Sequence, residues 1–331
     1  MPLRVALVGF RHGHMTSFVS AIRNLDYCEI AGVVEESDDD LSILQRTELE
    51  RTHPTFDNLL ADEQFDVVAT AEYYARRGSV IIKALQAGKH VVTDKPLCTT
   101  IEELREIKRL CDETGVEVSM QLSMRFGAPY QTMRALIQDG AIGVFEAATT
   151  FGQHPLGYPD TRPHWYFEEG KHGGTINDLY IHGADMLRYC TGREFETVVA
   201  AEGWNASLPE VPFFQVGAQC LMTMTGGART MADVSYMPGR GWQFFITGTQ
   251  GYLAVDHDRI LLHPIAGEDR IVEPGGVDLP FASPFEDFVS HLAFGTERFL
   301  PMDEVFRSQM AVLAAQKAAD TGERDLPVPA I

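Results

Sequence analysis

The sequence predicts an α/β protein of two domains: a doubly wound parallel sheet, then an α+β domain with a large, mostly antiparallel open sheet. Its 331 residues are long for one domain and comfortable for two. In the first third, short apolar runs alternate with helix-like stretches, as in parallel sheets with crossover helices. Past residue 122, strand-like runs follow one another with turn residues between them. We therefore expect domains at 1–122 and 123–331, with the last helix packing back on the first domain.

The first domain is expected to contain five strands separated by helices. Apolar runs predict the strands at 4–8, 29–34, 65–70, 89–93 and 116–122. Helical spacing of apolar residues predicts helices at 16–24, 80–87 and 100–113. The last of these is closed by Gly115, because glycine readily adopts the left-handed conformation found at helix ends.

The second domain is expected to open with helices at 130–137 and 174–189 and to close with a helix at 305–319. Five strands are expected between them, at 197–201, 215–225, 230–235, 243–248 and 252–256. In the second of these strands, Gln219 and Leu221 alternate with Cys220 and Met222, which predicts one wet and one dry face. The proline-containing tail at 326–329 is not expected to be helical.

The composition argues against several classes of partner. A formal net charge of −20 disfavours a broad nucleic-acid or anionic-membrane surface. The apolar run at 5–8 is too short for a signal-peptide core or a membrane span. The five cysteines are dispersed and form no Cys-x-x-Cys motif, so we expect reduced thiols and a cytoplasmic protein. The expected partner is a small molecule.

A glycine-containing turn joins the first predicted strand to the first predicted helix. The turn is made of Gly9, Phe10, Arg11, His12 and Gly13. In a dinucleotide-binding loop, glycines permit a tight turn and close approach of the pyrophosphate to a helix N-terminus. The match is degenerate, because Arg11 and His14 hold the second and third glycine positions. We expect the five residues of the turn to contact the cofactor, with Arg11 near the pyrophosphate.

A carboxylate follows the second predicted strand, about twenty residues after the glycine loop. Glu35 at this point can accept both ribose hydroxyls of an adenosine and would repel a 2′-phosphate, which favours NAD over NADP. The alternative is that Glu35 and Glu36 are solvated acids of the acidic run that reaches Asp40.

Two longer segments make the pattern specific. The first, at 84–96, ends in Asp-Lys-Pro at 94–96. The second, at 173–185, carries Gly-Gly and then an Asp-x-x-x-His motif at 178–182. Together with the strand–turn–helix at the start, they resemble the glucose–fructose oxidoreductase, inositol dehydrogenase and rhizopine catabolism family, called Gfo/Idh/MocA. The resemblance extends along nearly the whole chain.

The resemblance implies a role for each matching residue. The lysine of the family contacts the nicotinamide end and the reacting hydroxyl, and it corresponds to Lys95. The aspartate and histidine that face the substrate correspond to Asp178 and His182, and an arginine near the sugar corresponds to Arg125. Asp94, beside the lysine, is expected at the cofactor.

The loop after the third strand is expected to wall the nicotinamide. The family often has Thr-Pro-Asn here, whereas this chain has Thr70, Ala71 and Glu72. We expect Thr70 and Ala71 to contact the cofactor, although the departure leaves open which side chains do so. The resemblance also implies a homodimer or homotetramer that pairs through the sheet of the second domain.

The chemistry of these side chains supports the same roles. Oxidising a secondary alcohol needs a base for the hydroxyl proton while hydride leaves the carbon, and His182 can titrate near neutral pH. Asp178 lies four residues earlier on the same helical face, where it can orient the imidazole or bind a neighbouring hydroxyl. Lys95 can stabilise the developing alkoxide by its charge.

Other residues are weaker candidates. Trp165 is assigned to the substrate, because an aromatic face suits sugar-like ligands. Loop packing is an equal alternative for it and for the remaining candidates, which are His154, His164, His172, Tyr236 and Arg240. A metal site of His12, His14 and His182 is not expected, because no cysteine or carboxylate stands at ligand spacing with them.

We therefore expect an NAD-dependent dehydrogenase that transfers hydride between the cofactor and a secondary hydroxyl of a sugar, polyol or sugar acid. Two alternatives stay open. One is an enzyme that oxidises its substrate transiently to permit elimination or glycoside cleavage. The other is a non-catalytic nucleotide-sensing regulator built on the same fold.

Overall fold

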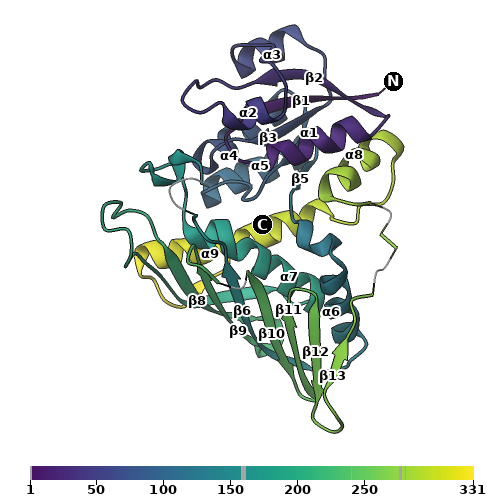
Figure 1. The fold of residues 1–331 in the computed structure, drawn as a ribbon, viewed down its shortest axis with the longest axis vertical. Helices are drawn as coiled ribbons and strands as arrows, with labels where there is room; N and C mark the ends of the chain where they lie inside the picture. Colours follow the sequence, from purple (N-terminus) through teal and green to yellow (C-terminus); the bar gives the residue numbers. More distant parts are fainter. Residues whose placement is uncertain (1, 158–161, 240, 276–277, 280) are drawn as a thin grey trace. The chain divides into compact units, whose positions relative to one another are not determined.

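The computed structural model describes residues 2–157, 162–239, 241–275, 278–279 and 281–331 (Figure 1). Contacts between Cα atoms divide the chain into two compact units. The first comprises Met1–Gln121, Pro163–His172 and Phe281–Phe306. The second comprises Leu122–Arg162, Gly173–Pro280 and Arg307–Ile331. None of the described helices combines the length and the apolar character that crossing a membrane requires.

The first unit contains a parallel sheet in the order β2-β1-β3-β4-β5. Its strands are β1 (Leu3–Phe10), β2 (Cys28–Val34), β3 (Val67–Ala71), β4 (His90–Thr93) and β5 (Val118–Met120). The predicted parallel sheet is confirmed. Val5 to Phe10 of β1 and all of β3 are buried, which explains why these strands are continuous apolar runs rather than alternating ones.

Helices accompany this sheet: α1 (Met15–Asn24), α2 (Ser42–Arg46), α3 (Phe56–Asp62), α4 (Tyr74–Gln86), α5 (Ile101–Thr114) and α8 (Pro284–Phe294). Phe18 of α1 and Phe285 and Phe288 of α8 lie in one buried cluster with residues of β1 and β3. Helix α4 packs against α5 and against β3 and β4. Helices α2, α3 and α8 were not predicted. The first two are too short to show a period. In α8, Phe285, Phe288 and Val289 do stand at helical spacing, so the sequence carried a signal there that the prediction missed.

Helix α4 begins at Tyr74, so the predicted start at residue 80 is wrong. The first turn and a half carries Arg76 and Arg77, which interrupt the apolar spacing in the sequence. In the structure Tyr74 and Arg77 are nevertheless buried. The predicted end of α5 is confirmed, since Gly115 adopts φ 73° there and its N–H donates to the carbonyl of Cys111.

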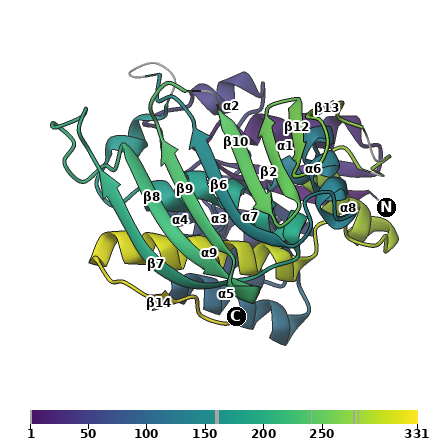
Figure 2. The same ribbon diagram turned by 90° about the horizontal axis from the view of Figure 1, so that it is seen from below.

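The second unit contains a nine-stranded sheet in the order β13-β12-β11-β10-β6-β9-β8-β7-β14 (Figure 2). Its strands are β6 (Phe145–Gln153), β7 (Phe195–Trp204), β8 (Gly217–Met224), β9 (Arg229–Ser235), β10 (Trp242–Gly248), β11 (Gly251–Asp256), β12 (Arg259–Pro264), β13 (Arg270–Val272) and β14 (Leu326–Pro327). Among the described pairings, only β6 and β9 run parallel, which confirms the mostly antiparallel sheet. β6, β12 and β13 were not predicted.

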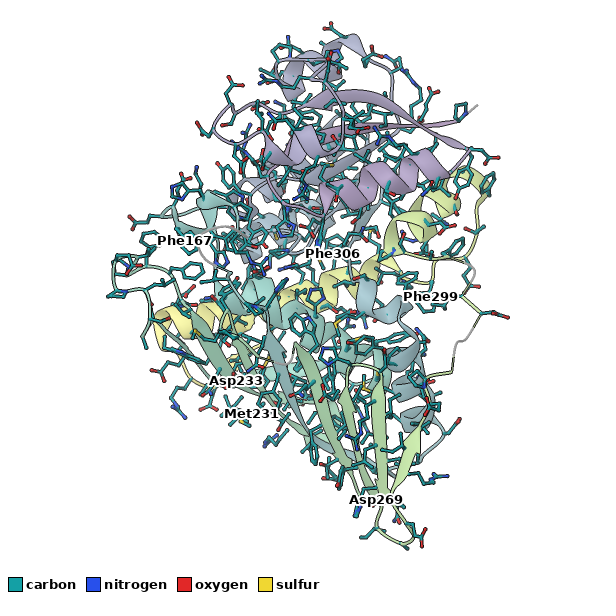
Figure 3. The ribbon with its side chains drawn as sticks, viewed as in Figure 1. Phe167, Met231, Asp233, Asp269, Phe299 and Phe306 are labelled. Atoms are coloured by element: carbon teal, nitrogen blue, oxygen red, sulfur yellow. The ribbon has the colours of Figure 1, made fainter. Side chains whose placement is uncertain are left out.

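One face of this sheet is covered by helices and the other is exposed. Helix α7 (Ile181–Thr191) contacts β6, and α6 (Ala128–Gln138) contacts β11 and β12. On β8, Gln219 and Leu221 are exposed while Cys220 and Met222 are buried, so the predicted wet and dry faces are confirmed. Figure 3 labels Met231 and Asp233 on β9, where Met231 is 47% exposed.

The predicted helix at 174–189 is not regular. A π-helical turn at Ile176–Tyr180 precedes α7. The side-chain carbonyl of Gln316 accepts the N–H groups of Ile176 and Asn177 at 2.9 and 3.3 Å, which satisfies donors that a helix start leaves open. Such wide turns are common at functional sites, and this one carries Asp178.

A buried carboxylate supports the chain beyond α8. Asp287 has no solvent exposure, accepts the N–H groups of Phe299 and Leu300 at 2.7 and 3.2 Å, and pairs with Arg298 at 3.2 Å. Replacing it with alanine leaves a buried guanidinium and two amides without this acceptor. We expect Asp287→Ala to lower the free energy of unfolding by about 3 kcal/mol in urea denaturation.

The matched control is Glu113→Gln, which removes an exposed carboxylate from an i,i+4 pair with Arg109. Exposed pairs of this kind contribute about 0.5 kcal/mol or less. Equal losses in the two variants would contradict the role given to Asp287.

Candidate functional site

The loop after β1 is held against the end of β3. Gly9 has φ +77°, and a Cβ added there would lie 2.9 Å from the Cα of Glu72. The carbonyl of Ala71 accepts the N–H groups of Arg11 and His12 at 3.1 and 3.0 Å. Only glycine tolerates both the conformation and the close approach at position 9, so a tight turn is built where a dinucleotide loop requires one.

The other residues predicted at the cofactor are placed as follows. Phe10 and Thr70 are fully buried, and Phe10 belongs to the apolar core. Gly13 has no such constraint, because a Cβ there would make only an ordinary 3.6 Å contact with Arg46. The second glycine of the turn is therefore not required by space.

A cavity of about 170 Å³ opens beside this loop in the first unit. It is lined by Val8, Gly9, Val34, Glu36, Phe56, Glu72, Arg76, Ser79, Val80 and Lys83. Apolar side chains and one aromatic ring provide walls for a purine, and a carboxylate can accept ribose hydroxyls. Together with the glycine turn, these residues fit the adenosine half of a dinucleotide.

Of the two adjacent acids that follow β2, Glu36 lines the cavity and Glu35 does not; Glu72 also lines it. Glu35 is 1% exposed, and its oxygens accept the N–H groups of Phe10 and Ser37 at 2.7 and 2.9 Å. Arg11 lies 3.4 Å from it, so that guanidinium is also engaged by the protein. The assignment of Glu35 to the ribose stays a prediction.

Glu36 is held in place at the cavity wall. It accepts the N–H of Phe56 at 2.9 Å and forms an ion pair with Arg76. Burial alone would raise the pKa of Glu36, but the Phe56 N–H and Arg76 outweigh it and lower the pKa. Glu36 therefore carries a negative charge at neutral pH. The sequence offered one signal for this residue, its place directly after Glu35.

Asp94, at the end of β4, is the most heavily contacted carboxylate of the site. It has no solvent exposure, and its two oxygens lie 2.7 Å from Nδ1 of His12 and Nδ1 of His14. The N–H of Lys95 donates to it at 2.7 Å, and Arg77 approaches to 3.4 Å. Burial raises the pKa of Asp94, but the charges of His14, His12 and Arg77 hold it well below its usual range.

This arrangement corrects one argument made from the sequence. A metal site was rejected because no carboxylate stands at ligand spacing with His12 and His14. Asp94 stands with them in the folded chain, and the three residues offer ligand atoms within 4.8 Å of one another. The sequence concealed it because 80 residues separate His14 from Asp94.

Arg77 was not predicted, yet it organises the loops after β3 and β4. Its guanidinium is fully buried and donates to the backbone carbonyls of Glu72, Asp94 and Pro96 at 2.8 to 3.2 Å. An arginine suits this position because it presents several donors in a fixed planar fork. The sequence did not reveal this role, because Arg77 follows Arg76 and two adjacent arginines are typical of an exposed segment.

Lys95 is buried beside the aromatic ring of Tyr74. It is 4% exposed, and its ammonium lies 5.7 Å from the centroid of Tyr74, within cation–π range. Tyr74 donates to or accepts from the hydroxyl of Tyr166 at 2.6 Å. Trp165 packs edge-on against Tyr74, and its indole N–H donates to the carbonyl of Arg11 at 2.8 Å. Trp165 therefore belongs to the first unit and braces the glycine loop.

Asp178 and His182 belong to the second unit. Asp178 is 1% exposed and accepts a hydrogen bond from the hydroxyl of Tyr236. The ring of His182 packs edge-on against Trp242, with 4.8 Å between centroids. Neither Tyr236 as the partner of Asp178 nor Trp242 could be paired with these residues from sequence spacing.

Arg125 lies in a buried ion pair. It is 1% exposed, and its Nε and Nη2 donate to the two oxygens of Asp185 at 2.8 and 2.6 Å. Its guanidinium also stacks on Tyr189 at 4.6 Å. Two of its donors are thus committed to the protein, and its contact with a substrate stays a prediction.

The weaker candidates are spread over both units. His164 and His172 belong to the first unit, where the ring of His172 packs 4.9 Å from that of Tyr166. His154 belongs to the second unit, and its N–H donates to the carbonyl of Ser235 at 3.0 Å. Arg240 lies outside the described residues.

Comparison with known proteins identifies the family. Residues 3–122 match the model of an oxidoreductase family with an NAD-binding Rossmann fold, and residues 130–254 match the model of the GFO/IDH/MocA C-terminal domain. The chain belongs to the Gfo/Idh/MocA family. The resemblance drawn from the sequence is thereby confirmed, and so is an NAD-binding fold in the first unit of this Gfo/Idh/MocA protein.

Several relatives of this Gfo/Idh/MocA protein carry names that refer to sugar substrates. The 1,5-anhydro-D-fructose reductase of Ensifer adhaerens is 33% identical over 134 residues, which cover 40% of each chain. The levoglucosan dehydrogenase of Pseudarthrobacter phenanthrenivorans is 28% identical over 199 residues, covering 59% of this chain and 50% of the relative. The chain thus spans half or less of the length of these two curated relatives.

The fold is shared with solved structures over the whole chain. A levoglucosan dehydrogenase in complex with NADH superposes with a TM-score of 0.81, covers 100% of both chains and is 19% identical. At this identity the similarity establishes the fold. The residues of the site must be argued from this Gfo/Idh/MocA protein itself.

The place of Glu36 makes a prediction about cofactor choice. We expect wild-type protein to bind NADH more tightly than NADPH, because Glu36 repels a 2′-phosphate. Glu36→Gln should reduce the ratio of the two dissociation constants by roughly tenfold, the equivalent of about 1.4 kcal/mol. Calorimetric titration of each variant with each dinucleotide measures both constants.

Glu29→Gln is the control, since it removes a glutamate of β2 that pairs with Arg4 and does not line the cavity. A ratio that stays at the wild-type value in Glu36→Gln would show that Glu36 does not face the 2′-position.

Proposed function

We propose that this protein is an NAD-dependent dehydrogenase that transfers a hydride between the nicotinamide cofactor and a secondary hydroxyl of a sugar, polyol or sugar acid. The proposal rests on the position of Lys95. Its backbone N–H donates to the buried carboxylate of the preceding Asp94, in a unit with an NAD-binding fold. Relatives named for sugar reduction and oxidation support the substrate class.

The proposed roles follow from the chemistry of alcohol oxidation. His182 takes the hydroxyl proton, because an imidazole can exchange a proton near neutral pH. Lys95 stabilises the negative charge that develops on the oxygen, and its burial strengthens that interaction. When bound, the nicotinamide supplies the hydride acceptor. Asp178, fixed by Tyr236, binds a neighbouring hydroxyl or orients the imidazole.

The environment of Lys95 suits this role. The ring of Tyr74 lies within cation–π range of its ammonium, and burial of the side chain limits its contact with water. The neighbouring Asp94 carboxylate is already engaged by His12, His14 and Arg77. A lysine so enclosed presents its charge in a medium of low polarity, where charge stabilisation in a transition state is largest.

Site variants test the assignment. We expect NAD+ reduction with one or more members of a panel of polyols, sugars and sugar acids, followed by NADH absorbance. Lys95→Ala and His182→Asn should each lower kcat about 10²- to 10⁴-fold while leaving the NADH dissociation constant within a few-fold of wild type. Lys317→Ala, which alters an exposed lysine of α9 (Met302–Thr321), is the control.

Two outcomes would contradict the proposal. Full activity in the Lys95→Ala variant would show that Lys95 has no catalytic role. Turnover with retained NAD(H) and no net absorbance change would indicate transient oxidation, followed by elimination or glycoside cleavage, instead of net hydride transfer.

We further propose that the protein forms a homodimer or homotetramer in the cytoplasm through the open face of the nine-stranded sheet. That face presents large apolar side chains at Leu221, Met231 and Phe245, each between 39% and 47% exposed. Apolar area of this kind on a sheet favours pairing. The five cysteines are all free thiols, as expected in a reducing compartment.

Light scattering after gel filtration tests the assembly. We expect a wild-type mass of two or four chains and a shift toward one chain in Phe245→Arg, because the new charge would be buried in the contact. Ile265→Arg places the same charge on an exposed turn and should leave the mass unchanged. A wild-type monomer at micromolar concentration would refute the proposal.

A further inference from the structure

The loop after β1 and the end of β4 bring together three side chains that commonly bind transition metals. Nδ1 of His12 lies 2.7 Å from one oxygen of Asp94, and Nδ1 of His14 lies 2.7 Å from the other. The two imidazole rings meet edge to face, with 4.6 Å between their centroids. One ligand atom from each residue falls within 4.8 Å of the others.

We propose that His12, His14 and Asp94 form a binding site for one divalent transition-metal ion, with Zn²⁺ as its representative. Two imidazole nitrogens and one carboxylate oxygen are a donor set that suits Zn²⁺, Co²⁺ and related first-row ions. Mg²⁺ and Ca²⁺ prefer oxygen ligands and are not expected to compete. An ion here replaces the hydrogen bonds between the imidazoles and the carboxylate, which requires the three groups to open by a few tenths of an ångström.

The carboxylate is already oriented for this task. The N–H of Lys95 donates to one oxygen of Asp94 at 2.7 Å, and Arg77 lies 3.4 Å from the other. Outer contacts of this kind hold the ligands of metal sites and tune their affinity. The charge of Arg77 opposes a cation, so we expect a dissociation constant well above that of structural zinc sites.

The site has an entry path. Asp94 is fully buried and His12 nearly so, but the side chain of His14 is 48% exposed. An ion can therefore arrive from the side of His14 and keep water in its remaining positions, as at zinc sites that are not closed by a fourth protein ligand. Because the loop carries His12, Gly13 and His14 in succession, both imidazoles come from one short segment whose backbone is fixed by Ala71.

Metal binding to the full chain tests the proposal directly. Protein stripped with a chelator is dialysed against Zn²⁺, and bound metal is measured by mass spectrometry. The wild type should bind one ion per chain. His14→Gln should weaken binding at least tenfold, and Asp94→Asn should abolish it. Visible absorption of the Co²⁺-loaded protein should show the bands of a low-coordinate site, and His14→Gln should lose them.

A second histidine–aspartate pair provides the matched control. His257 lies 2.8 Å from Asp256 on the surface of the second unit, and among the described residues the pair belongs to no group of three potential ligands. His257→Ala should keep the wild-type stoichiometry and affinity. His14→Gln removes a half-exposed side chain and should retain the wild-type circular dichroism, so a loss of metal in it reports the ligand and not the fold. No stoichiometric binding in the wild type, or equal binding in His14→Gln, would overturn the proposal.

Discussion

The carboxylate of Asp94 is the group on which the candidate site in the first unit depends. A charge removed from water costs several kcal/mol unless it is paired and hydrogen-bonded. Asp94 meets that requirement with two imidazoles from the loop after β1, a guanidinium from α4 and the N–H of Lys95. Three segments of the chain are thus fixed around the two carboxylate oxygens of Asp94. These contacts also fix the backbone position of Lys95, the next residue.

Arg77 extends the same constraint to the backbone. It is buried, and it donates to carbonyls in the loops after β3 and β4. The glycine turn is hydrogen-bonded to the end of β3, where this first loop begins, through the carbonyl of Ala71. The parts that would bind the dinucleotide and the lysine proposed to act on the substrate therefore share one hydrogen-bonded support. A change in any of its charged members removes partners from several buried groups at once.

The second unit uses the same principle with different residues. Arg125 and Asp185 form a buried pair, and the hydroxyl of Ser308 donates to Asp185 while accepting from Arg188. The side chain of Gln309 donates to Asn177, next to Asp178. The π-helical turn that carries Asp178 is thereby tied to residues more than 100 positions later. In each unit, buried polar networks rather than surface pairs position the candidate residues.

The sequence by itself determined the parallel sheet, the mostly antiparallel second sheet, the glycine turn at Gly9 and the family. These features depend on local patterns: apolar runs, the two-residue alternation of β8 and a glycine that must take a positive φ. Strands such as β12 and helices such as α2 and α3 were missed because they are short and owe their stability to packing against other elements.

Only the tertiary structure decided which charged groups meet. The side chain at the end of β2 that lines the cavity is Glu36, since Glu35 turns inward to the N–H groups of Phe10 and Ser37. Asp94 joins His12 and His14, and Arg77 becomes a buried support, although spacing along the chain shows neither. The physical reason is that hydrophobic periodicity is set by neighbours in sequence, whereas the pairing of a buried charge is set by whichever partners the fold brings within hydrogen-bonding distance.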